Sequence, residues 1–114
     1  MDLKDYKRVT KNKFKEMDCD LEIWGGSGWA RLNYNLVEKF NLEQINKLSV
    51  FSLNEYLIFV FGKNEDKKMV YNSGQSRGVY IKDNPDLKGK YKLMTFETDK
   101  ENNKVYLKFK KMEF

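Results

Sequence analysis

The sequence predicts a mostly β domain: a small barrel of two interlocked hairpin halves in one chain, with one short helix. Three observations support this prediction. Apolar and aromatic runs of strand length follow one another along the chain, 15% of the residues are aromatic, and the order of elements recurs after 46 residues. With 114 residues, the chain is long enough for one hydrophobic core but too short for two.

The first half of the predicted barrel spans residues 19–63. Runs rich in aromatic and β-branched residues predict four strands, at 21–24, 29–34, 47–53 and 56–61. Leu36, Val37 and Phe40 have near-helical spacing, which predicts the short helix around 35–41. Residues 53–55 are predicted to form the tight turn of a hairpin.

The second half spans residues 64–114 and repeats this order. Strands are predicted at 68–71, 77–81, 91–98 and 104–110. The stretch "KDNPDLKGK" predicts a turn or a single helical turn, with Pro85 suited to its first position. The stretch "DKENN" is the predicted loop of the last hairpin.

The repeat is visible when the sequence is shifted on itself by 46 residues. Ser27 then falls on Ser73, Gly28 on Gly74, Arg31 on Arg77 and Tyr34 on Tyr80. Each half alone is too small to bury its apolar faces, but two halves can close each other's sheet edges. We therefore expect a monomeric pseudo-dimer, or at most a weak homodimer.

Residues 21–61 resemble the AbrB/SpoVT/MazE swapped-hairpin domains, and among these the MazE-type antitoxins most closely. The resemblance depends on an ungapped order of motifs: "WGGS", "ARL", the helix "NLVEKFNL", and the hairpin runs "KLSVFSL" and "NEYLIF". It covers about forty residues clearly and, through the repeat, most of the remainder weakly.

The resemblance implies a non-enzymatic, DNA-binding transcriptional regulator with double-stranded DNA as its partner. The family's loop serine and strand arginine correspond to Ser27 and Arg31, and the repeat adds Asn72, Ser73 and Arg77. Arginine is the commonest reader of guanine, and loop hydroxyls suit phosphates. We expect Arg31 and Arg77 to face the same side of the barrel.

The charge distribution supports an anionic partner. Lys and Arg number 22 against 17 Asp and Glu, which gives a net charge of +5. Residues 1–18 form a predicted basic arm, in which Lys7 and Arg8 are candidates for phosphate contact. Residues 64–114 hold twelve basic and eight acidic side chains.

Composition also excludes several functions. The chain has no histidine and one cysteine, Cys19, so the usual zinc sites and histidine-dependent nucleophiles cannot form. We expect no enzyme, no metal and no cofactor. The lone cysteine favours the cytoplasm, and the longest apolar run, "YLIFVFG", is too short to cross a membrane.

Two other functions stay open. The family has basic residues before its tryptophan, whereas this chain has Glu22 and Ile23. We expect its final stretch, "KVYLKFKKMEF", to form a strand and not the acidic tail of an antitoxin. These departures keep a second hypothesis: a small phage or mobile-element inhibitor that binds a host nucleoprotein or nuclease effector. A third is single-strand or RNA binding through exposed Tyr and Trp faces. Equally, Trp24 and Trp29 can be hairpin packing residues, and the arginines solvated strand residues.

Overall fold

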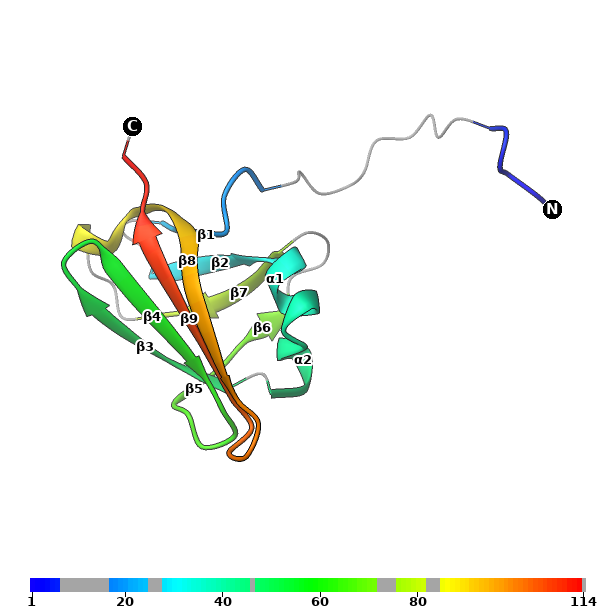
Figure 1. Cartoon of the computed structure of the whole chain (residues 1–114). Helices are drawn as coiled ribbons and strands as arrows, with labels where there is room; N and C mark the ends of the chain where they lie inside the picture. Colours follow the sequence, from blue (N-terminus) through cyan, green and yellow to red (C-terminus); the bar gives the residue numbers. More distant parts are fainter. Residues whose placement is uncertain (7–16, 25–27, 46, 72–75, 82–84, 114) are drawn as a thin grey trace.

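The computed structural model of the chain describes residues 1–6, 17–24, 28–45, 47–71, 76–81 and 85–113. Within these ranges it contains nine strands, two short helices and one 3₁₀ turn (Figure 1). The helices are α1 (Tyr34–Lys39) and α2 (Leu42–Ile45), and the 3₁₀ turn η1 spans Pro85–Leu87. The strands are β1 (Leu21–Ile23), β2 (Trp29–Asn33), β3 (Lys47–Leu53), β4 (Tyr56–Phe61), β5 (Lys67–Lys68), β6 (Val70–Tyr71), β7 (Ser76–Tyr80), β8 (Gly89–Asp99) and β9 (Lys104–Lys111). The mostly β prediction is confirmed.

The strands of this part of the chain form one antiparallel sheet in the order β5-β3-β4-β9-β8-β1-β2-β7-β6. Hairpins from the two halves of the chain alternate in that order: β3–β4, then β9–β8, then β1–β2, then β7–β6. Neither half therefore has a sheet of its own. The halves interlock hairpin by hairpin, as a small barrel made of two halves requires.

The sheet curls because its two end strands belong to one short segment of chain. β5 pairs with β3, β6 pairs with β7, and a single residue, Met69, separates β5 from β6. The Met69 side chain is buried in the core. Residues 67–71 therefore connect the first and last strands of the sheet. They cover sheet edges that would otherwise be open to other chains.

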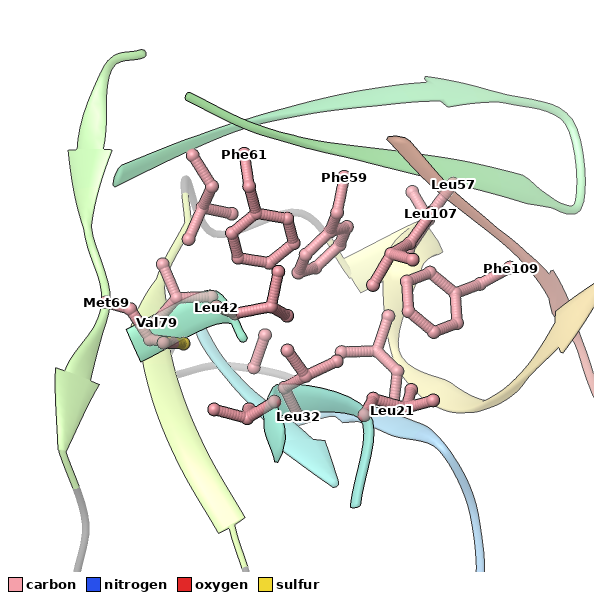
Figure 2. Close-up of a cluster of buried hydrophobic side chains, with 14 of the residues drawn as sticks. Leu21, Leu32, Leu42, Leu57, Phe59, Phe61, Met69, Val79, Leu107 and Phe109 are labelled. Carbon is pink, nitrogen blue, oxygen red and sulfur yellow. The ribbon is translucent and has the colours of Figure 1, made fainter. Parts of the chain in front are cut away.

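The core lies inside the curl of the sheet (Figure 2). Alternate residues of the neighbouring strands β4 and β9 point into it, and the rings of Phe59 and Phe109 meet edge to face with centroids 5.4 Å apart. Burial of each such side chain contributes about 1.5–3 kcal/mol to folding. The inward-facing set on these two strands is Leu57, Phe59, Phe61, Val105, Leu107 and Phe109.

The short helix predicted around 35–41 is present as α1, and a second short helix, α2, follows it at Leu42–Ile45. The side chain of Asn33 caps α1 by accepting the N–H of Asn35 at 3.0 Å. Asn41 then adopts a positive φ of 55°, which ends the first helical segment before α2 begins. Both helices bury two apolar side chains each in the core.

The predicted turns agree with the structure. Asn54 and Glu55 join β3 to β4 as a two-residue turn, in which Asn54 has a φ of 55°. The predicted single helical turn is η1, and it begins at Pro85. A four-residue loop, 100–103, joins β8 to β9.

Candidate nucleic-acid interface

Arg77 lies on the inner side of the sheet and is held by the helices. Its backbone pairs with Leu32, a buried core residue, and directly opposed residues share a face of a sheet. The guanidinium donates to the Glu43 carboxylate of α2 from Nη2 at 2.8 Å and from Nε at 3.2 Å. It also lies 4.4 Å from the ring centroid of Tyr34, and its side chain is 13% exposed. Arg77 thus ties α1 and α2 to β7.

Arg31 faces the other way. It pairs with Gly78 on the outer face, where its guanidinium lies 3.9 Å from the Glu22 carboxylate and 5.4 Å from the Trp24 ring centroid. The expectation that Arg31 and Arg77 face the same side of the barrel was wrong. In the ladder of β2 and β7, Arg31 is opposite Gly78, and Arg77 is opposite Leu32. Neighbouring residues of a strand point to opposite faces of the sheet, so the two arginines lie on opposite faces.

The other predicted contact residues cannot be placed. Ser27, Asn72, Ser73, Lys7 and Arg8 all lie outside the described residues. Of the seven candidates, the structure therefore places Arg31 and Arg77 alone, and it does not bring them together.

Three aromatic side chains form a row on the outer face of β1, β2 and β7. The Trp24 N–H donates to the Trp29 carbonyl at 3.0 Å, and Trp29 pairs with Tyr80. The Trp29 and Tyr80 rings meet edge to face with centroids 5.8 Å apart. Gly28 next to this row has a φ of 72°, and an added Cβ would meet the Ile81 carbonyl oxygen. Cross-strand aromatic packing is therefore a role that the structure shows for this stretch.

A second outer surface is formed by β3, β4, β9 and β8, which lie side by side (Figure 1), at the end of the sheet that holds the β3–β4 turn. Two rows of opposed residues cross it: Phe51–Ile58–Lys108 and Leu53–Tyr56–Lys110–Lys92. On β4 and β9 these residues alternate with residues that point into the core. We call this surface the lysine–aromatic face; it consists of Phe51, Leu53, Tyr56, Ile58, Lys92, Lys108 and Lys110.

The lysines of this face have no carboxylate partner among the residues that the structure describes. Lys108 lies 4.6 Å from the Tyr56 ring centroid. Lys90, by contrast, sits two residues before Lys92 and is paired with Asp18 at 2.7 Å, a contact that raises the pKa of Lys90 and lowers that of Asp18. The positive charge of Lys92, Lys108 and Lys110 is thus available to a partner.

A shallow hollow adjoins the two outermost lysines of the face. It has a volume of about 490 Å³ and is lined by Lys92 and Lys110 together with neighbouring lysine and methionine side chains. Glu113 is the carboxylate that lines it. The surroundings of these lysines are therefore mixed apolar and basic, with a single acid at the rim.

The described residues do not gather the ligands of a metal site, and their cysteine is buried. Burial raises the pKa of the Cys19 thiol to about 11, so this cysteine is neutral at physiological pH and a poor nucleophile. Among the residues searched, no group of three or more His, Cys, Asp or Glu side chains could hold a metal ion. No helix in the described ranges is long and apolar enough to cross a membrane.

Comparisons with protein-family models, with curated proteins and with solved structures give no match. The resemblance to the swapped-hairpin family therefore stays a prediction.

Sequence reasoning missed the lysines of β8 and β9 as candidate site residues. The signal was present in "KVYLKFKK", where Lys104, Tyr106, Lys108 and Lys110 alternate with apolar residues. That period places the lysines on one outer stripe of a strand. Their neighbours on β8 and β4 could not be identified until the register was known.

Proposed function

We propose that this protein is a non-enzymatic nucleic-acid-binding protein that contacts its partner through the lysine–aromatic face. The observation that carries the proposal is the cluster of Lys92, Lys108 and Lys110 without a carboxylate partner among the described residues. Lys92 and Lys110 are directly opposed in the sheet. Like charges in that position are destabilising, and a bound phosphate would relieve their repulsion.

Charge is distributed unevenly along the β8–β9 hairpin, which supports the same surface. All three acidic residues of this hairpin, Glu97, Asp99 and Glu101, lie near its loop. The opposite end carries five lysines and no acid between residues 89–96 and 106–111. Such a polarised strip attracts an anionic backbone and orients it.

This surface also suits a DNA-binding regulator, but neither Arg31 nor Arg77 is then the main contact with DNA. Arg77 is neutralised by Glu43 and half-enclosed by Tyr34, so it is unsuited to reading guanine. Arg31 is partly neutralised by Glu22 and serves at most as a secondary contact. The lysines of β8 and β9 carry the main electrostatic attraction.

The test is the salt dependence of binding, measured by fluorescence anisotropy with labelled DNA and RNA. The variant Lys92→Ala/Lys108→Ala/Lys110→Ala should bind more weakly, and its slope of log affinity against log salt should flatten by about 2–3. The matched control is Lys47→Ala/Lys63→Ala/Lys100→Ala, which removes three exposed lysines elsewhere. Equal losses in both variants, with unchanged thermal midpoints, would contradict the proposed surface.

A second candidate function is a protein-binding inhibitor, favoured by the exposed apolar side chains on β3. Phe51 is 57% exposed and Leu53 is 71% exposed. Exposed apolar side chains that adjoin one another are typical of protein contacts. A pull-down from lysate, with and without nuclease treatment, separates the two functions. A stoichiometric protein partner that survives nuclease and is lost in Phe51→Ala/Leu53→Ala would favour the inhibitor.

A further inference from the structure

We infer that the lysine–aromatic face selects single-stranded over double-stranded nucleic acid, with a base stacking on Phe51 and phosphates held by Lys92, Lys108 and Lys110. This inference rests on the proposed nucleic-acid binding and names the form of nucleic acid that the same site takes. Unpaired DNA and unpaired RNA share the required chemistry: an exposed base face on one side and a phosphate chain on the other.

The first argument is the division of the face into two parallel tracks. The apolar and aromatic side chains, including Phe51 and Tyr56, lie on the adjacent strands β3 and β4. The lysines lie on the next two strands, β9 and β8. Neighbouring strands are about 4.8 Å apart, so the two tracks run side by side along the strand direction. A single strand laid along them would have its bases over one track and its phosphates over the other.

The second argument is the exposure of the rings. Phe51 is 57% exposed at the outer surface, although a phenylalanine normally gains stability from burial. Tyr56 is only partly exposed, and the ammonium of Lys108 lies over its ring, 4.6 Å from the centroid. Phe51 is therefore the ring that is open to stacking, and it can accept any base because every base has a π face.

The third argument is the width of the face. Four strands span three inter-strand spacings, which is about 14 Å between the outermost strand axes. The major groove of B-DNA is about 12 Å wide and admits a helix or a two-stranded ribbon. The face is therefore too broad to reach base edges in a duplex. The phosphates of a duplex could contact the lysines, but its paired bases could not stack on the Phe51 ring.

The experiment measures the affinity of the full chain for oligothymidine, for oligouridine and for a DNA duplex of the same length. The variants are Phe51→Leu, which keeps apolar character but removes the ring, and Tyr56→Phe, which keeps the ring. We expect Phe51→Leu to bind both single strands about ten-fold more weakly, with an unchanged salt slope and unchanged duplex affinity. Tyr56→Phe should bind like the original protein.

Each outcome has a distinct meaning. Full single-strand affinity in Phe51→Leu, or duplex binding as tight as single-strand binding, overturns the inference and leaves the proposed function in place. Absence of salt-dependent binding to all three probes overturns the proposed function as well. Weaker binding of both oligothymidine and oligouridine by Phe51→Leu supports the inference, and the difference between the two probes shows which of these single strands the site prefers.

Discussion

Replacing Arg77 by alanine should destabilise the fold. From the sequence alone, this arginine of β7 would usually be assigned to the solvent-exposed surface. The side chain is 13% exposed and contacts groups from both helices. Its removal leaves Glu43 without this partner and uncovers the ring of Tyr34. The comparison residue is Arg31, which is 27% exposed and lies 3.9 Å from Glu22.

The magnitude follows from the two contacts. A hydrogen-bonded ion pair with a partly exposed carboxylate contributes about 1 kcal/mol, since bonds to charged groups are worth more than exposed pairs. A half-buried cation–π contact adds about 1 kcal/mol. Arg77→Ala should therefore lower the free energy of unfolding by about 2 kcal/mol, or roughly 8 °C in thermal midpoint for a domain of this size. Arg31→Ala should cost about 0.5 kcal/mol.

Urea unfolding followed by circular dichroism measures both variants, and a double-mutant cycle with Glu43→Ala isolates the pair. The coupling energy between Arg77 and Glu43 should be about 1 kcal/mol, against a few tenths for Arg31 and Glu22. If Arg77→Ala destabilised the protein no more than Arg31→Ala, the assignment of Arg77 to helix attachment would be refuted. Loss of nucleic-acid affinity in a fully stable Arg77→Ala variant would restore it as a contact residue.

Three further predictions concern the fold. Gly28→Ala should cost about 1–3 kcal/mol by chemical denaturation, because Gly28 has a φ of 72° and its new Cβ would meet the Ile81 carbonyl oxygen; an unchanged unfolding midpoint would contradict that geometry. Phe59→Ala should cost about 3–5 kcal/mol and Phe51→Ala less than about 1 kcal/mol, since the first side chain is buried in the core and the second is exposed; equal losses would be incompatible with the register of β3 and β4. The Cys19 thiol should react slowly with a thiol reagent at neutral pH unless the protein is unfolded. Because its folded pKa is raised to about 11 from 9.0, stability should fall as pH rises between these values, and less so in Cys19→Ala. A pH profile identical in the two proteins would contradict the burial of this thiol.

The strands could be predicted from sequence because their signals are local. Runs such as 56–61 and 104–110 combine alternation with aromatic and β-branched residues, and the structure places strands at Tyr56–Phe61 and Lys104–Lys111. The turns at Asn54 and Pro85 could also be predicted, because asparagine and proline are typical turn residues. The break between α1 and α2 could not be predicted, because the spacing of apolar residues does not show that Asn41 adopts the left-handed backbone conformation.

The candidate site could not be predicted in the same way, because it depends on register. Arg31 and Arg77 look equivalent in the sequence, but the pairing of β2 with β7 places them on opposite faces. The lysine–aromatic face is assembled from residues as far apart as Phe51 and Lys110, which are brought together by the pairing of β3, β4 and β9. Such long-range pairing leaves no trace in a local window.

The alternation of hairpins from the two halves of the chain has a consequence for how folding responds to concentration. Every ladder that joins β1 to β8, β2 to β7 or β4 to β9 links residues 19–63 to residues 64–114. Two separate polypeptides would have to meet by diffusion to form these ladders, and their folded fraction would fall on dilution. One continuous chain instead supplies each half to the other at an effective concentration in the millimolar range for a short connection. Within one chain, the formation of these ladders therefore does not depend on protein concentration.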